Sequence, residues 1–450
     1  MDRPNIVLIL ADDTGWGDCG CYNSESQIPT PHIDRLAAEG RVFTDAHAPS
    51  ALCTPTRYGL LTGRYYWRTA KKHALVMPYE PPVIEPERPT LASMLRQSGY
   101  QTACIGKWHL GFRYPAKRHI ATRYTQREGD VDFEKSLEGG PLESGFDSFF
   151  GTAGCSTSDP PYCFIENDRV VDLPSVPSTE DLHALPGFYP GLMAPGWDLA
   201  EVDVALAQQA VAVIERHASQ RPSDPLFLYY PLSAPHNPWV VPDFLRGSSG
   251  DGPRGDMNVL VDWCVGQVYA ALERCGMLDD TLFIFTSDNG PQYHTGEGGH
   301  RATGGFRGRK NTAFEGGHRV PFVVRWPGKV PAGTTSDALL CLTDMMATFS
   351  SLTGTDLPEE AGEDSFDVLP LLLGRSGYDP ERPAMVCDTG SRGAVAGDFA
   401  VRVENWKLIV TAPREKRDSE ERLLFDLASD PFEECDLKND FPAVAADLQQ

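Results

Sequence analysis

The sequence lacks the features that mark membrane-spanning and secreted proteins. No apolar run approaches the roughly 18 residues that a membrane helix needs, and the longest tight run, Ile6 to Ala11, has the length of a strand. No charged segment and apolar signal core precede that run, and no Asn-x-Ser/Thr acceptor is present. We therefore expect no membrane partner and a cytoplasmic protein as given, or a periplasmic or secreted one if a signal has been removed.

Basic residues are scarce relative to acidic ones. The chain has 40 Lys and Arg against 63 Asp and Glu, which gives a formal net charge of −23. Nucleic-acid binding needs a basic face for the phosphates, so we expect no nucleic-acid partner. An anionic substrate would have to be bound by a local cluster of cations or by a metal ion, against the field of the whole protein.

A disulfide framework is also absent from the pattern. The 11 cysteines are an odd number scattered over 450 residues, and no second Cys/His cluster has zinc-site spacing. We interpret the cysteines other than Cys53, including Cys19 and Cys21, as structural thiols. Hydrophobic residues at 41% and charged residues at 23% are globular values, which excludes wholesale disorder.

What the sequence does contain is a series of short apolar runs that end in polar residues. Four runs are predicted strands: Asn5–Leu10 before Asp12 and Asp13, Tyr100–Ile105 before Lys107 and His109, Leu226–Tyr230 before His236, and Leu282–Thr286 before Asp288 and Asn289. Helical patterns alternate with them, which predicts an α/β fold with a mostly parallel central sheet flanked by helices. Ligands bind beyond the carboxyl ends of such strands, so these polar residues are expected at one site.

Two segments depart from this pattern. Residues 141–197 are rich in Pro, Gly, Ser and Asp without a strong period, which favours an insertion over the site rather than part of the sheet. After Gly374 the chain changes to short strand-like runs separated by charged turns. We predict a catalytic α/β domain over residues 1–375 and a small C-terminal α+β subdomain with an antiparallel sheet over residues 376–450.

The sharpest local signal is Cys53-Thr54-Pro55-Thr56-Arg57, followed by Leu61-Thr62-Gly63-Arg64. Pro55 suits the first turn of a helix and Gly63 its end, so Cys53 is predicted at a helix N-terminus, where free N–H groups favour anions. Arg57, about one turn on, can point to the same place. These residues predict either a reactive thiolate or an anion site. A cysteine-dependent phosphatase is excluded, because Gly59 stands where its Arg belongs.

Several motifs in the same order resemble the sulfatase family of the alkaline-phosphatase-like superfamily over nearly the whole chain. They are Pro4-Asn5-Ile6 with Asp12-Asp13, Cys53 to Arg57, Gly106-Lys107-Trp108-His109-Leu110-Gly111, Ala234-Pro235-His236, Ser287-Asp288-Asn289-Gly290, Lys310 with Glu315-Gly316-Gly317, Arg319-Val320-Pro321, Arg325-Trp326-Pro327-Gly328, and Leu424-Phe425-Asp426-Leu427 with Asp430-Pro431. Thr56 stands where Ser is common. The resemblance implies an alkaline-phosphatase-like core and an arylsulfatase-like sulfuric ester hydrolase. Its expected partner is a sulfated small molecule or glycan.

The resemblance also implies the chemistry. A formylglycine-generating enzyme would convert Cys53 to formylglycine, whose aldehyde hydrates to a geminal diol. One hydroxyl attacks sulfur and the alcohol leaves; the second hydroxyl then loses a proton, and sulfate is expelled. The implied metal ligands are Asp12, Asp13, Asp288 and Asn289 with the modified Cys53. Oxygen donors in this number favour one Ca²⁺ per chain over Mg²⁺.

The remaining roles follow from the same resemblance. His109 takes the proton in the elimination step, His236 and Lys310 face the sulfate and can protonate the leaving alcohol, and Lys107 and Arg57 stabilise the diol and the anion. Substrate contacts are expected where members of the family diversify: Trp239, Tyr293, His294, His300, Arg301, Arg307 and the 141–197 segment.

Two alternatives stay open from the sequence. Phosphate and sulfate are both tetrahedral, so a phosphomonoester, phosphodiester or phosphonate-ester hydrolase of the same superfamily is the first. A catalytically silent relative that binds sulfated glycans is the second. The sugar or aryl group, the position of its sulfate and the oligomeric state are not predicted.

Overall fold

The computed structural model describes residues 3–117, 128–293, 296–390, 397–413 and 420–450. Within these ranges a ten-stranded sheet has the order β13-β2-β12-β11-β1-β10-β4-β5-β6-β7. Its five central strands are mutually parallel: β11 (Thr281–Ser287), β1 (Asn5–Ala11), β10 (Leu226–Pro231), β4 (Gln101–Lys107) and β5 (Ser148–Thr152). The outer strands are β12 (Phe322–Arg325), β2 (Arg41–Phe43) and β13 (Thr334–Ser336) on one side, and β6 (Ile165–Glu166) and β7 (Arg169–Val170) on the other. The predicted mostly parallel sheet is confirmed.

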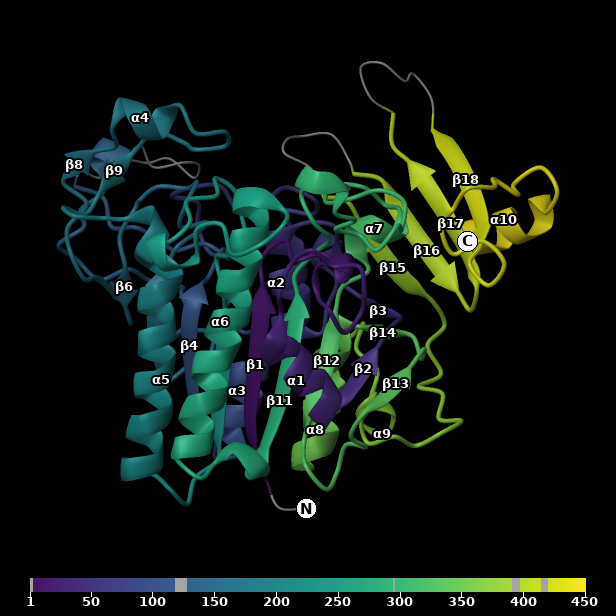
Figure 1. Ribbon diagram of the computed structural model, residues 1–450, viewed down its shortest axis with the longest axis horizontal. Helices are drawn as coiled ribbons and strands as arrows, with labels where there is room; N and C mark the ends of the chain where they lie inside the picture. Colours follow the sequence, from purple (N-terminus) through teal and green to yellow (C-terminus); the bar gives the residue numbers. More distant parts are fainter. Residues whose placement is uncertain (1–2, 118–127, 294–295, 391–396, 414–419) are drawn as a thin grey trace.

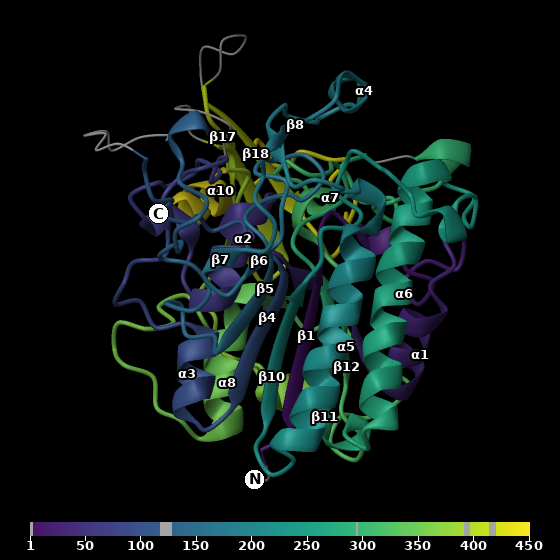
Figure 2. The same cartoon turned by 90° about the vertical axis from the view of Figure 1, so that its left-hand side faces the viewer.

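Helices cover both faces of this sheet, as Figure 2 shows. The first face carries α1 (Pro31–Glu39), α5 (Val202–Gln220) and α6 (Gly252–Arg274), and the second carries α2 (Cys53–Thr62), α3 (Leu91–Gln97) and α8 (Met345–Thr353). The continuous apolar run of β1 is explained by this layering, because alternate residues of the strand face opposite cores. None of the described helices combines the length and apolarity needed to cross a membrane.

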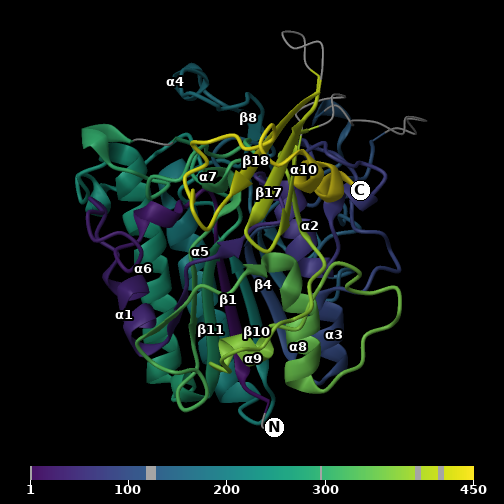
Figure 3. The same ribbon diagram turned by 90° about the vertical axis from the view of Figure 1, so that its right-hand side faces the viewer.

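A second, four-stranded sheet forms the C-terminal part of the described chain (Figure 3). Its antiparallel strands are β15 (Met385–Asp388), β16 (Phe399–Val403), β17 (Trp406–Thr411) and β18 (Glu421–Asp426), accompanied by α10 (Pro442–Gln449). The shorter elements are β3 (Ala46–His47), β14 (Leu340–Cys341), β8 (Val176–Pro177), β9 (Leu192–Met193), α4 (Glu180–His183), α7 (Glu315–His318) and α9 (Leu369–Leu372). The predicted antiparallel sheet is confirmed, while the domain boundary at residue 375 stays a prediction.

The segment 141–197 divides into two parts. Its strands β5 to β7 extend the main sheet, so the prediction that the segment lies outside the sheet is wrong for them. The reason is that β5 reads Ser-Phe-Phe-Gly-Thr, too short and mixed for a strand pattern. Gly151 is required there, because a Cβ would lie 1.8 Å from the carbonyl oxygen of Gly106 on β4. The part that contains β8, α4 and β9 lies beyond the carboxyl ends of the strands (Figure 1).

Candidate active site

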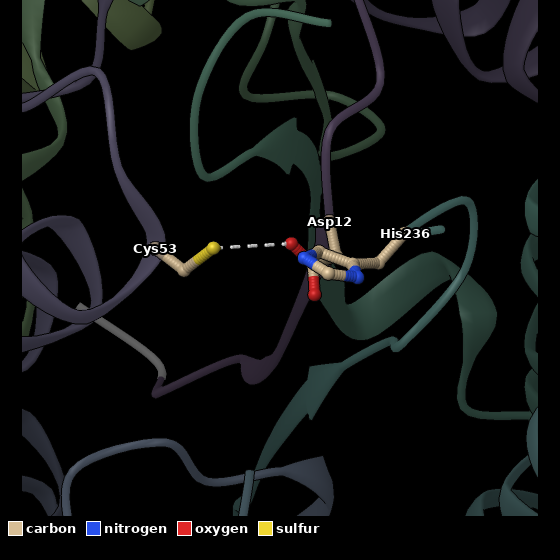
Figure 4. Close-up of side chains that lie close together, drawn as sticks. All are labelled: Asp12, Cys53 and His236. Carbon is tan, nitrogen blue, oxygen red and sulfur yellow. Dashed lines mark hydrogen bonds between the residues drawn. The ribbon is translucent and has the colours of Figure 1, made fainter. Parts of the chain in front are cut away.

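The carboxyl ends of two central strands and the start of α2 meet at one buried point. Asp12 and Asp13 follow β1, Asp288 follows β11, and Cys53 begins α2. One ligand atom from each of these four residues lies within 4.8 Å of the others. Figure 4 shows Cys53 pointing at Asp12, with Sγ 3.5 Å from Asp12 Oδ1, and the ring of His236 beside the same carboxylate.

Helix α2 holds Cys53 in place at its N-terminus. The helix is buried along its whole length and ends at Gly63, whose φ of 64° is the left-handed conformation that glycine adopts without strain. Both predicted ends of this helix are confirmed. The Thr54 hydroxyl donates to the carbonyl oxygen of His109 at 3.2 Å, which ties the first turn to the loop after β4.

Buried cations surround the carboxylates. Burial alone would raise the pKa of Asp12, but Lys107 Nζ contacts its Oδ2 and its positive charge holds the pKa well below the usual value. Arg57 Nη2 and Nε donate to Asp288 Oδ2 at 2.8 and 3.1 Å. Burial and the neighbouring Asp12 nevertheless raise the pKa of Asp288 well above its usual value. The carboxylates of Asp12 and Asp288 therefore still repel each other, and a further cation between them would be favourable.

The oxygen atoms of this cluster fit a hard divalent cation. Asp13 Oδ1 accepts from Asn289 Nδ2 at 2.7 Å and from Lys310 Nζ at 2.5 Å. In contrast, Asp13 Oδ2 and Asn289 Oδ1 are buried without a hydrogen-bond partner among the described residues. Buried oxygens without donors are costly unless something else binds them, and oxygen-rich sets are the usual ligands of Ca²⁺. Asp12, Asp13, Asp288 and Asn289 could hold such an ion.

Two histidines face the same space with their proton positions set by backbone carbonyls. His109 Nε2 lies 3.1 Å from the carbonyl oxygen of Val76, which only accepts, so the proton is on Nε2 and Nδ1 is free to take one. Burial lowers the pKa of His109, which keeps it neutral. His236 Nδ1 lies 2.6 Å from the carbonyl oxygen of Asn237, so its Nε2 faces the space.

Cys155 is a member of this site that sequence reasoning missed. Its Sγ lies 3.9 Å from His109 Nδ1 and 3.7 Å from His236 Nε2. A hydrogen bond with Cys155, together with burial, raises the pKa of the Cys53 thiol to about 11, so an unmodified Cys53 is a poor nucleophile at neutral pH. Cys155 follows β5 at the same sheet edge as the other site residues, but β5 is too short and mixed to be predicted, so no signal in the sequence marks it.

A cavity of about 290 Å³ opens above Cys53. Its lining residues come from the site and from four surrounding segments: Leu52, Cys53, Leu75, Val76, Met77, His109, Cys155, Ser158, Asp159, Pro186, Gly187, Tyr189, His236, Asn237, Gln292, Tyr293 and Lys310. Residues 155–189 thus form part of the wall over the reaction centre. A small anionic ester would fit between the buried cations and these walls.

The residues expected to contact substrate are mostly elsewhere. Tyr293 lines the cavity, and the ring of Trp239 packs edge-on against the Tyr293 ring, with ring centroids 5.5 Å apart. His300, Arg301 and Arg307 do not line the cavity. His300 Nε2 lies 2.8 Å from Asp18 Oδ1, and Arg307 donates to the carbonyl oxygen of Glu433 at 2.6 Å. Arg301 is exposed. The loop turns away because the carbonyl oxygen of Ala302 accepts from Gly17 N at 2.8 Å. His294 lies outside the described residues.

Comparisons with known proteins agree with this geometry. Residues 4–355 match the sulfatase family model, and residues 306–449 match the C-terminal region of N-sulphoglucosamine sulphohydrolase. The chain is 32% identical to an N-acetylgalactosamine-6-O-sulfatase of Bacteroides thetaiotaomicron, over 100% of this chain and 92% of that protein. It is 34% identical to human arylsulfatase A, over 96% of this chain and 83% of that protein. A solved Bacteroides thetaiotaomicron structure, described under the metabolism of multiple glycosaminoglycans, has a TM-score of 0.84 and 30% identity, covering 100% of this chain and 98% of that one.

Proposed function

The chain belongs to the sulfatase family, and from that premise we propose that it hydrolyses a sulfate monoester with a formylglycine made from Cys53 and one bound Ca²⁺. The observation that carries the proposal is the set of buried oxygens around Cys53, of which Asp13 Oδ2 and Asn289 Oδ1 have no hydrogen-bond donor. The enzyme class, a sulfuric ester hydrolase, follows from the family itself.

The metal ion and the aldehyde would supply a positive charge beside the sulfate and a hydroxyl nucleophile, which the unmodified side chains do not provide. Asp12, Asp13, Asp288 and Asn289 would hold the ion, whose charge offsets that of the sulfate oxygens. A formylglycine at residue 53 would supply, once hydrated, one hydroxyl as the nucleophile for sulfur and a second hydroxyl for the release of sulfate by elimination. This arrangement needs no ionised thiol at residue 53, which agrees with the raised pKa of the Cys53 thiol.

His109 is the group that accepts a proton in the release step. Its Nδ1 faces the space beside Cys53, while the proton on Nε2 is held by the carbonyl of Val76. Because burial lowers its pKa, the imidazole is neutral and ready to act as a base near neutral pH.

The cations bind the sulfate and stabilise the charge that develops on it. Lys310 and His236 line the floor of the cavity, where they can face the sulfate and the leaving oxygen. Lys107 and Arg57 lie behind the carboxylates and keep Asp12 ionised. Preorganised charges of this kind act strongly in a site from which water is excluded.

A sulfated sugar is the proposed substrate, and N-acetylgalactosamine 6-sulfate is the first candidate. The support comes from the relative that is 32% identical over the full chain and is named for that activity. A formylglycine-generating enzyme would be needed as the maturation partner.

Parallel turnover of p-nitrophenyl sulfate and p-nitrophenyl phosphate tests the reaction. We expect faster release from the sulfate by the wild type and none above background by Cys53→Ala. Faster hydrolysis of the phosphate would favour the phosphoesterase alternative. Binding of sulfated glycans without hydrolysis of either ester would indicate a silent relative.

A further inference from the structure

One acidic side chain stands in the wall of the cavity above Cys53. Asp159 is partly exposed, and its carboxylate, Cys155 Sγ and a ring nitrogen of His109 all lie within 4.8 Å of one another. Its Oδ2 accepts from the backbone N–H of Cys155 at 3.2 Å, which fixes the carboxylate in this position. Across the described chain no Lys, Arg or His forms an ion pair with Asp159 at 4.0 Å or less.

The positive charge of the cavity is confined to its floor. Among the described lining residues, the Lys, Arg and His side chains are Lys310, His109 and His236. Lys310 is already bonded to Asp13, and all three surround the place that the sulfate would occupy. The residues of the upper wall apart from Asp159 are uncharged: Leu75, Met77, Ser158, Pro186, Tyr189, Asn237, Gln292 and Tyr293. A second anionic group on a substrate would therefore find no cation among the described residues of the upper wall.

The uncharged part of the wall suits a sugar ring. Tyr189 and Tyr293 line the cavity and are 45% and 46% exposed, so each offers the face of an aromatic ring and a hydroxyl. A carboxylate accepts hydrogen bonds from neutral hydroxyls, which makes Asp159 attractive to an uncharged sugar. At about 290 Å³ the cavity is at the small end of ligand sites, roughly 300–1,000 Å³, and has room for little beyond one sulfated ring.

Building on the proposed function, we infer that Asp159 restricts the enzyme to sugars whose sulfate ester is their only negative group. A neutral hydroxyl donates to the Asp159 carboxylate, whereas a second sulfate or a carboxylate is repelled by it without a compensating cation. Specificity of this kind arises from an unfavourable contact with the wrong ligand as much as from a favourable contact with the right one. Asp159 is thus a specificity-determining residue.

Competition experiments test this role whether or not a given sugar is cleaved. N-acetylgalactosamine 6-sulfate and N-acetylgalactosamine 4,6-disulfate are measured as inhibitors of p-nitrophenyl sulfate turnover. We expect the wild type to bind the monosulfate about tenfold or more tightly than the disulfate, because like charges placed together in a binding site are costly. Asp159→Asn should reduce this ratio severalfold, mainly by tighter binding of the disulfate, and Asp159→Glu should keep it.

Matched controls separate the possible outcomes. Asp181→Asn, on exposed α4 and outside the cavity lining, removes the same charge and should leave the ratio unchanged. An equal ratio in the wild type, or an unaltered ratio in Asp159→Asn, would overturn the inference. So would a fall in kcat with a shifted pH profile at constant ratio, which would place the role of Asp159 in positioning His109. Absence of p-nitrophenyl sulfate turnover by the wild type would instead contradict the proposed function.

Discussion

Two clusters of buried charge in this molecule differ in what they leave unsatisfied. The active-site cluster gathers Asp12, Asp13, Asp288, Arg57, Lys107 and Lys310 at the sheet edge. The second cluster, here called the subdomain anchor, joins His47, Glu315 and His318 of the catalytic part to Lys407 and Glu433 of the C-terminal part. Both are almost fully buried, and both contain three residues whose ligand atoms lie within 4.8 Å of one another.

The charged groups of the subdomain anchor are paired with one another: even Glu433 Oε1, which accepts no hydrogen bond, lies 2.8 Å from Lys407 Nζ in an ion pair. Lys407 Nζ lies 2.9 Å from Glu315 Oε1 and 3.0 Å from His318 Nε2, while the Nδ1 atoms of His318 and His47 lie 3.0 Å apart. His47 Nε2 lies 2.8 Å from Asp45 Oδ1. A metal ion at this place would have to displace these partners and would be repelled by Lys407.

The active-site cluster is open by comparison. Two of its oxygens lack donors, and a cavity leads to it. Buried charge alone therefore does not identify a reaction centre, because burial of charge is equally compatible with a structural contact. What distinguishes the active site is unsatisfied ligand atoms beside an accessible space.

Of the changes that test this comparison, removal of the nucleophile should have the largest effect on activity. Cys53→Ala is expected to lower sulfate release by about 10⁴-fold or more, the order found when a hydrolase loses its nucleophile. The free energy of unfolding should change by no more than about 1 kcal/mol, since the side chain is small. Activity assays with urea unfolding check both, and an active Cys53→Ala enzyme would refute the assignment of residue 53.

Disrupting the subdomain anchor should have the opposite result, a loss of stability with unchanged activity. Lys407→Met leaves Glu315 and Glu433 without their cation, which is expected to destabilise the fold by about 3–5 kcal/mol. Turnover per folded molecule and bound calcium should stay at the wild-type level. Urea unfolding and metal analysis measure these quantities. Loss of calcium in this variant would show that the two clusters are not independent.

Withdrawal of calcium should affect only the open cluster. Chelation with EGTA is expected to abolish turnover and to lower the melting temperature, because an ion present at 100 times its Kd stabilises the folded state by about 2.7 kcal/mol. Added Ca²⁺ should restore both. Asp288→Ala should show neither bound calcium nor a response to EGTA, and unchanged metal content in that variant would contradict the ligand set.

Mild acid should produce the smallest effect, to which the histidines of the subdomain anchor contribute. Burial, with the charge of Lys407, lowers the pKa of His318 well below its usual value, and burial lowers the pKa of His47. The charged groups facing this pair are Asp45, Glu315, Arg319, Arg402 and Lys407. Because His47 and His318 bind protons near pH 6.5 in the unfolded chain but not in the folded chain, their contribution to stability is complete above that pH and falls as the pH drops below it.

The control for this pH dependence is His318→Gln. Its urea midpoint should fall less steeply than that of the wild type between pH 7 and pH 5.5. Between pH 7 and pH 5.5 the buried carboxylates of Asp45 and Glu315, whose pKa values are lowered in the folded protein, contribute little to the slope, because both are largely ionised in the unfolded chain as well. Equal slopes in the variant and the wild type would show that His318 is not the group that titrates.

Most of the active site could be predicted from the sequence, but little of the subdomain anchor could. Asp12, Lys107 and Asp288 each follow a long apolar strand. Because the carboxyl ends of parallel strands lie at one edge of a sheet, the meeting of these residues could be inferred from the sequence. Cys155 and Asp159 could not, because the short strand before them contains a glycine whose fit against Gly106 appears only in three dimensions.

The subdomain anchor and the substrate contacts escaped prediction for a related reason. His47, Glu315 and Lys407 lie far apart in the chain, the nearest two by 92 residues, and no local pattern marks their contact. Arg307 and His300 were expected at the substrate because they precede Lys310 in the chain, yet hydrogen bonds to Glu433 and Asp18 hold them elsewhere. The position of a residue along a glycine-rich loop does not predict which way its side chain points.

The most direct test of the central claim is the mass of the peptide that contains residue 53, from a preparation that releases sulfate from p-nitrophenyl sulfate. We predict the mass of formylglycine, and labelling of that peptide by an aldehyde-reactive hydrazide. An active preparation in which residue 53 is entirely an unmodified cysteine would contradict the account.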